Sequence, residues 1–256
     1  MQPSRKIAVA GATGRVGRHV VEVLEARGYD VVAMSRATGV DLVTGEGLAA
    51  ALEGVEIVID VATGASPDQQ EATAFFTTAA RNLHAAGTRA GVQRMIMVSI
   101  IGTDRFATGY SAAKVAHEQA MLSGPIPVRV LRAAQFHEFV AQLLDWGRQG
   151  ERSYVPDMRT QLVAARTVAE ALVDLATDPA PATNGARITE VAGPREERLA
   201  DMARLLAARR GDPVAVEAVS DASNPEHRLY AAGALLPGPD ARLAGPTFAQ
   251  WLQAAA

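Results

Sequence analysis

Cysteine is absent from this 256-residue sequence, so disulfide bonds, thiolate metal sites and cysteine nucleophiles are excluded. Lysine is nearly absent, because two of the 25 basic residues, Lys6 and Lys114, are lysine and the other 23 are arginine. The sequence contains no stretch of roughly 18 apolar residues, the length that a membrane-spanning helix needs. Its first residues lack the apolar segment of a signal peptide. We therefore expect a protein of the reducing cytoplasm.

A strong charge bias is also lacking. The formal net charge is -3 and the pI is near 6.0, which gives no electrostatic attraction toward nucleic acid or an anionic membrane. The five histidines show no metal-ligand spacing, so no metal site is predicted. A small molecule is left as the expected partner, and a homodimer through long helices stays open.

What the sequence does contain is an alternation of short apolar runs with amphipathic segments of helical length, typical of βαβ units and a mostly parallel sheet. We predict an α/β fold of the Rossmann type, doubly wound, as one domain over residues 1–256. Residues 1–150 would be its nucleotide-binding core, and residues 151–256 a smaller substrate-side region interleaved with the sheet. The predicted core strands are residues 6–10, 30–34, 56–61, 94–99 and 127–131.

Helices are predicted between these strands from apolar residues spaced along one helical face. One covers residues 15–27 and stops at Gly28, and another covers residues 68–86 and stops at Gly87. The later part of the chain is expected to hold helices at residues 167–176 and 199–210 and strand-like segments near Gln161 and Ile188. A last short helix would contain Phe248.

A glycine-rich turn follows the first strand directly, because KIAVA continues into GATGRVG. Gly11, Gly14 and Gly17 have the spacing that allows a tight turn and a close approach of the backbone to a pyrophosphate, which the amides of the next helix then bind. An ordinary strand-to-helix turn is the alternative, but the place of the motif at the first βαβ unit favours dinucleotide binding.

The choice between NAD and NADP is indicated at the end of the second strand, where an acidic residue would bind the ribose 2′-hydroxyl of NAD. Ser35 and Arg36 occupy that place. A guanidinium suits a 2′-phosphate better than a hydroxyl, so NADP(H) is favoured. A solvated surface arginine is the alternative interpretation of Arg36.

The segment YSAAK places Tyr110 and Lys114 four positions apart, on one face of a predicted helix. A carbonyl that accepts a hydride needs a proton donor, and a nearby ammonium should lower the pKa of a tyrosine toward neutrality. The same ammonium could hold the nicotinamide ribose. Accidental pairing is the alternative, yet a chain that uses arginine almost everywhere has lysine here.

Polar residues at two strand ends are further candidates. Ser99 ends the strand RMIMVS, where its hydroxyl could bind a substrate carbonyl, and Thr103 is the alternative candidate for this role. An ordinary serine at a strand end is nearly as good an explanation. Asp60 ends an otherwise apolar strand and is expected only to accept hydrogen bonds from loop amides.

Together, GATGRVG, VSIIG, YSAAK and VLRAAQFHEF resemble the short-chain dehydrogenase/reductase superfamily, and most closely its atypical, NmrA-like NAD(P)H-binding branch. The resemblance covers essentially the whole chain and implies a Rossmann fold, NADP(H) and a Tyr-Lys pair. It implies nucleotide contacts from Gly11, Thr13, Gly14, Arg15, Val16, Arg36, Asp41, Leu42, Ala62 and Lys114. It also places residues 133–136, beginning with Ala133, beside the nicotinamide.

The substrate would lie in loops after the strand ends, at residues 100–106, 135–140 and 152–159. These segments supply an apolar set with a few polar tips, suited to a quinone, an enone or an aromatic ketone. The candidates are Phe106, Gln135, Phe136, His137, Phe139, Tyr154 and Met158. The alternative is that the aromatics are core and that His137 is structural.

These observations favour an NADPH-dependent oxidoreductase that reduces a small carbonyl, enone or quinone, with Tyr110 as proton donor and Lys114 and Ser99 as its partners. A redox sensor that binds NADP(H) without turnover is the first alternative, since the NmrA-like branch contains such members. A non-redox isomerase or epimerase is the second. Fold alone does not choose among them.

Overall fold

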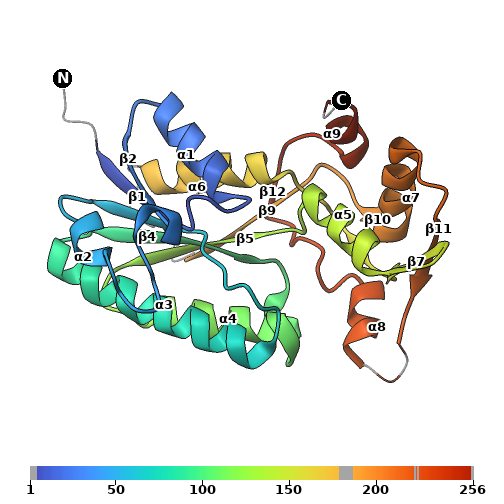
Figure 1. Ribbon diagram of the computed structural model, residues 1–256, viewed down its shortest axis with the longest axis horizontal. Helices are drawn as coiled ribbons and strands as arrows, with labels where there is room; N and C mark the ends of the chain where they lie inside the picture. The colour runs from blue at the N-terminus through green and yellow to red at the C-terminus, as the bar shows by residue number, and fades with distance from the viewer. Residues whose placement is uncertain (1–4, 179–186, 222, 224, 255–256) are drawn as a thin grey trace. The chain divides into compact units, whose positions relative to one another are not determined.

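The central element of the structure is a seven-stranded sheet with the strand order β2-β1-β3-β4-β5-β9-β12 (Figure 1). Its strands are β1 Lys6–Ala10, β2 Asp30–Met34, β3 Ile57–Asp60, β4 Arg94–Ile100, β5 Val128–Ala133, β9 Ile188–Ala192 and β12 Arg242–Leu243. The pairs β1/β2, β1/β3, β3/β4 and β9/β12 are parallel. Since β2 and β3 flank β1, the strand order reverses there, and ligands of such sheets bind beyond the strand ends at this point.

The structure is a computed structural model that describes residues 5–178, 187–221, 223 and 225–254. The α/β fold of the Rossmann type is confirmed. The strands β1 and β2 have the predicted bounds, and β3, β4 and β5 begin or end within two residues of theirs. Strands are recognisable here because their residues are nearly all apolar, as expected for a sheet covered on both faces.

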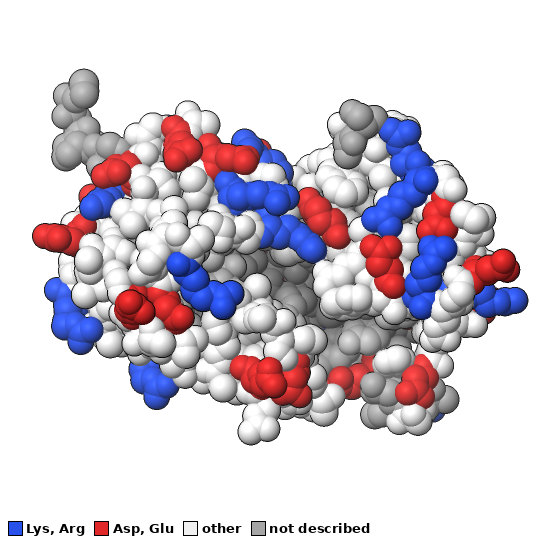
Figure 2. Space-filling model, in the orientation of Figure 1, with Lys and Arg blue, Asp and Glu red and all other residues white. Residues whose placement is uncertain are grey.

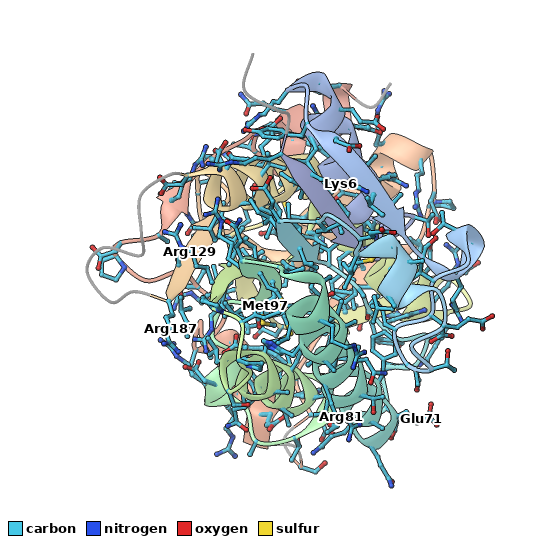
Figure 3. The ribbon with its side chains drawn as sticks, turned by 90° about the vertical axis from the view of Figure 1, so that its left-hand side faces the viewer. Lys6, Glu71, Arg81, Met97, Arg129 and Arg187 are labelled. Atoms are coloured by element: carbon cyan, nitrogen blue, oxygen red, sulfur yellow. The ribbon has the colours of Figure 1, made fainter. Side chains whose placement is uncertain are left out.

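Helices cover both faces of this sheet. In Figure 1, α1 Gly17–Ala26 and α6 Ala165–Thr177 lie on one face, while α3 Gln69–Ala90 and α4 Gly109–Leu122 lie on the other. The short α2 Leu48–Ala51 precedes β3. On α3, Glu71 and Arg81 lie on the outer side, whereas Met97 of β4 is enclosed in the core (Figure 3).

The predicted end of α3 at Gly87 is wrong, because the helix continues to Ala90 and ends at Gly91, whose φ is +78°. Gly87 is buried inside the helix, and a Cβ there would lie 2.8 Å from the Ile126 side chain and 3.0 Å from Met95. The glycine therefore allows close packing at this place. Gly91 adopts the left-handed conformation that ends helices.

The chain divides into two compact units. Unit 1 comprises residues 1–99, 106–132 and 168–189, and unit 2 comprises residues 100–105, 133–167 and 190–256. Unit 2 contains the three-stranded sheet β11-β7-β6, in which β7 pairs with β6 antiparallel and with β11 parallel, and the two-stranded sheet β10-β8. Its further elements are α5 His137–Trp146, β6 Arg148–Gln149, β7 Arg152–Pro156, β8 Arg159–Thr160, β10 Glu197–Arg198, α7 Leu199–Arg210, β11 Ala215–Val219, α8 Pro225–Ala231 and α9 Phe248–Ala254.

Two segments expected to be loops are regular elements instead. Residues 137–140 begin α5, in which Val140 and Leu144 are buried one helical turn apart. Residues 152–156 form β7, whose Ser153 and Val155 are fully buried. Both elements are stabilised by contacts made within unit 2, which a pattern read along the chain does not reveal.

The charges on the face drawn in Figure 2 are mixed, with acidic and basic side chains interspersed. Among the described residues, no helix is long and apolar enough to cross a membrane. Nor does any group of three or more His, Asp or Glu side chains in this part of the chain have the arrangement of a metal site.

Candidate active site

The glycine turn after β1 folds as a tight loop against the ends of two neighbouring strands. Gly11 has φ +80°, its amide donates to the carbonyl of Met34 over 2.9 Å, and a Cβ on it would lie 2.7 Å from Cα of Ala62. A Cβ on Gly17 would lie 2.0 Å from the carbonyl oxygen of Gly11. Neither position has room for a side chain, which is why the motif requires glycine.

The start of α1 is suited to an anion. Val16 is the N-cap residue of α1, and within the described ranges its side chain makes no capping hydrogen bond. The first turn of α1 holds no acidic residue. Thr13, Gly14 and Arg15 are exposed in the loop that precedes it. Backbone amides and the helix dipole at such a terminus favour a phosphate, so the residues present fit the pyrophosphate of a dinucleotide.

The loop after β2 contains the residues expected near the adenosine ribose. Ser35 and Thr38 cap a 3₁₀ turn, and Arg36, its first residue, is exposed. The carboxylate of Asp41 accepts hydrogen bonds from the amides of Val43 and Thr44, and so shapes the loop. The carbonyl of buried Leu42 accepts a hydrogen bond from the side chain of α3 residue Asn82, which fixes the loop to unit 1.

The Tyr110 phenol lies at the start of α4 and is half-buried. Its oxygen is 2.9 Å from the hydroxyl of Thr63, an exposed residue three positions beyond the end of β3. Its ring packs edge-on against Phe76, with 5.9 Å between centroids. Burial raises the pKa of Tyr110, and the hydrogen bond with Thr63 partly offsets the rise. The predicted lowering of this pKa is therefore wrong in direction, because desolvation dominates.

The Lys114 side chain points into unit 1 and is 4% exposed. Its ammonium donates to the carbonyl of Val98 over 2.9 Å and lies 3.0 Å from Nδ1 of His117. The nitrogen also lies 4.5 Å from the centroid of the Phe76 ring. Lys114 and Tyr110 share a helix as predicted, and the contacts recorded for the ammonium are with the interior of unit 1.

Ser99 is the third member of the predicted catalytic set. It lies in β4, is 3% exposed, and its hydroxyl has no hydrogen-bond partner among the described residues. A buried hydroxyl without a partner costs free energy unless a ligand or water satisfies it. Thr103, the alternative to Ser99, is fully buried in the 3₁₀ turn Thr103–Arg105 of unit 2.

The substrate candidates are divided between the units. Phe106 is buried in unit 1. In unit 2, Gln135 accepts a hydrogen bond from Thr160 over 2.8 Å, and Phe139 packs edge-on against Trp146. The other substrate candidates that lie in unit 2 are Phe136, His137, Tyr154 and Met158, and the predicted nicotinamide neighbour Ala133 lies there too.

His137 has a structural setting. Its Nε2 donates to the carbonyl of Pro246 over 3.1 Å, and its ring contacts Phe248 and Trp251. Burial lowers the pKa of His137 to about 4, so the ring is neutral near pH 7 and Nε2 carries the donated proton.

Two residues of the site were missed by sequence reasoning. Thr63 carries no motif, and only its place after β3 points to it. His117 lies three positions after Lys114 and seven after Tyr110, and so on the same helical face. Asp60 was noticed: its Oδ1 accepts from the amide of Ala62 over 3.0 Å, as expected, but its Oδ2 also accepts from His117.

The strand order, the glycine turn after β1 and the helices on both faces of the sheet define a Rossmann-type α/β fold, which solved short-chain dehydrogenase/reductase structures share. The model of the NAD(P)H-binding family matches residues 11–179, and the chain belongs to this family. Its cofactor is therefore a nicotinamide dinucleotide.

Solved structures share this fold over nearly the whole chain. One is a short-chain dehydrogenase/reductase superfamily protein from Agrobacterium tumefaciens with bound NAD, 19% identical, covering 98% of this chain and 96% of that one, with a TM-score of 0.68. Another is dTDP-4-dehydrorhamnose reductase from Bacillus anthracis in complex with NADP, 17% identical over 98% of both chains, TM-score 0.71. A third is a nucleoside-diphosphate-sugar epimerase from Staphylococcus aureus, 15% identical, covering 97% and 99%, TM-score 0.70. A search of curated protein sequences finds no significant match.

Proposed function

We propose that this protein is an NADPH-dependent reductase of the NmrA-like branch that reduces the carbonyl, enone or quinone group of a small, largely apolar substrate. The observation that carries the proposal is the Tyr110 phenol, bonded to Thr63 over 2.9 Å beside the strand ends where the sheet order reverses. Burial raises the pKa of Tyr110 and so keeps the phenol protonated at neutral pH. A proton donor in that state suits reduction.

When bound, the reduced nicotinamide supplies the hydride. Tyr110 donates its proton to the substrate oxygen and becomes a phenolate, and Ser99, whose hydroxyl lacks a partner within the described residues, holds that oxygen beforehand. Thr63 is exposed and touches the phenol, so it can return a proton to Tyr110 from solvent. Lys114, one helical turn after Tyr110 on α4, contributes a positive charge near the phenol.

Exposed Arg36 supports the preference for NADP(H) because it lies two positions beyond the end of β2 and can pair with a 2′-phosphate. Replacing it with alanine should weaken NADPH binding by roughly 10- to 100-fold, the range of a charged hydrogen bond, and NADH binding much less. Calorimetric titration of both dinucleotides measures this. Arg89→Ala, which removes an exposed arginine at the end of α3, is the matched control. Equal weakening of both dinucleotides would contradict the preference.

A redox sensor is the second candidate, favoured by the inward contacts of the Lys114 ammonium with Val98 and His117. The decisive experiment follows the absorbance of NADPH with a panel of quinones, enones and ketones, for the parent and for Tyr110→Phe and Thr63→Val. A reductase loses at least about 100-fold in kcat with Tyr110→Phe, the size expected for a lost general acid. A sensor binds NADPH and turns over no substrate of the panel.

A further inference from the structure

Beneath the Tyr110 helix, three ionisable side chains form a continuous buried chain. Nζ of Lys114 lies 3.0 Å from Nδ1 of His117, and Nε2 of His117 lies 3.1 Å from Oδ2 of Asp60. Lys114 is 4% exposed and the other two are 1% exposed. Lys114 and His117 come from α4 and Asp60 from β3, so the chain joins a helix to the sheet it covers.

The direction of each hydrogen bond in this chain follows from its ends. An ammonium only donates, so Nδ1 of His117 must accept from Lys114. The proton of the neutral ring then sits on Nε2 and is donated to the Asp60 carboxylate. The second carboxylate oxygen of Asp60 accepts from the amide of Ala62. A neutral ring fits its surroundings, because burial, followed by the charge of Lys114, lowers the pKa of His117.

The other groups around Lys114 are neutral or already paired, so Asp60 is the carboxylate that balances its charge. From β4 the Val98 carbonyl accepts from the ammonium, and from α3 the Phe76 ring faces it. On α4 itself Glu118 also raises the pKa of Lys114, but its two oxygens are bound to Arg132 of β5 over 3.0 and 2.8 Å. The remaining ionisable group on this helix face, Tyr110, has a raised pKa and is neutral near pH 7.

We propose that Asp60 and His117 are positioning residues for Lys114: through a fixed imidazole tautomer, the buried carboxylate keeps the ammonium charged and held inside unit 1, one helical turn from Tyr110. Its catalytic consequence rests on the proposed function, because a retained positive charge stabilises the phenolate that forms when Tyr110 gives up its proton. The electrostatic claim itself can be tested without turnover.

The two-lysine sequence makes a direct titration possible. With lysine labelled by ¹³C at Cε, Lys6→Arg leaves a single resonance, that of Lys114, whose shift reports its ionisation. Burial lowers the pKa of Lys114 to about 8, with Asp60 the largest opposing influence. Asp60→Asn should lower the midpoint by roughly one unit or more. The asparagine amide would donate to Nε2, move the ring proton to Nδ1, and so remove the acceptor for the ammonium.

The role of the imidazole is tested by a matched pair of histidines. His117→Leu should lower the Lys114 midpoint as Asp60→Asn does, whereas His117→Gln, with an amide that can accept and donate, should restore most of it. His84→Leu is the control, because His84 is also buried and, within the described residues, its ring bonds backbone groups, the carbonyl of Met121 and the amide of Ile126. A purely structural role would make His117→Leu and His84→Leu alike in this titration.

A measurement on the parent protein is independent of any folding defect in the variants. ¹⁵N shifts of the histidine rings should show His117 protonated at Nε2 alone from pH 6 to about pH 8. Protonation at Nδ1, or a Lys114 midpoint that Asp60→Asn leaves unchanged, would overturn the proposal. If the Lys114 titrations give the expected results but no substrate of the panel is reduced by NADPH, only the proposed function would be overturned.

Discussion

Among the described residues, both units hold a histidine that is buried beside aromatic rings, yet these two histidines serve different purposes. In unit 1 the ring of His117 stacks on Phe76 and links Lys114 to Asp60. In unit 2 the ring of His137 packs on Phe248 and Trp251 and bonds one backbone carbonyl, and its Nδ1 has no partner among the described residues. Burial alone therefore does not mark a functional histidine; the charge of its partners does.

The largest expected difference lies in what each histidine leaves behind when removed. His117→Leu strands a carboxylate and an ammonium in the core, which should cost about 3–5 kcal/mol of unfolding free energy. His137→Leu leaves one carbonyl without a donor, which should cost about 1–3 kcal/mol. Urea denaturation of both variants measures the contrast. Equal losses would mean that the charges near His117 are not held by it.

Two glycines that lie close to a backbone carbonyl, one in each unit, allow a second comparison of stability and NADPH binding. Gly17→Ala places a methyl group against the Gly11 carbonyl, and Gly193→Ala in unit 2 places one 1.9 Å from the Leu162 carbonyl. Each should cost roughly 1–3 kcal/mol of stability, as overpacking does. Only Gly17→Ala should also weaken NADPH binding, by at least about tenfold, because it distorts the turn that receives the pyrophosphate. Similar affinities for the two variants would place the dinucleotide elsewhere.

Acid should lower the stability of the folded protein through the unit 2 histidine, His137. The pKa of His137 is about 4 in the folded protein and about 6.5 when unfolded, so the unfolded chain binds the proton first. Its contribution to stability is complete above pH 6.5 and declines as the pH falls toward 4, by about 1.4 kcal/mol for each unit. Denaturation between these pH values should show a weaker slope for His137→Phe than for the parent.

The smallest effect is expected from exposed ion pairs, of which Arg159 and Glu196 in unit 2 are an example. Although the guanidinium bonds both carboxylate oxygens, solvent and salt screen the pair. Glu196→Gln should leave the melting temperature unchanged within error, at low and at moderate salt. A clear loss of stability would show that this surface pair matters as the buried Arg132–Glu118 pair does.

The sequence predicted those parts of the fold and site that depend on local pattern. The apolar runs located β1 and β2, and the spacing of Gly11 and Gly17 located the tight turn after β1, because each is decided within a few residues. The orientation of Lys114 was not predictable, since spacing places a side chain on a helix face and leaves its rotamer to distant partners such as Asp60. The strand β7 of unit 2 was missed for the same reason, because it is stabilised by pairing with the remote β11.

The enclosure of Lys114 has a practical side for chemical labelling. An acylating dye or a coupling resin needs a free and accessible amine, and Lys114 offers neither, since its nitrogen is shielded by Val98, His117 and Phe76. Between the two lysines, conjugation should therefore occur at Lys6, at the start of β1. A tether attached to Lys6 would hold the protein to a sensor surface by the start of β1.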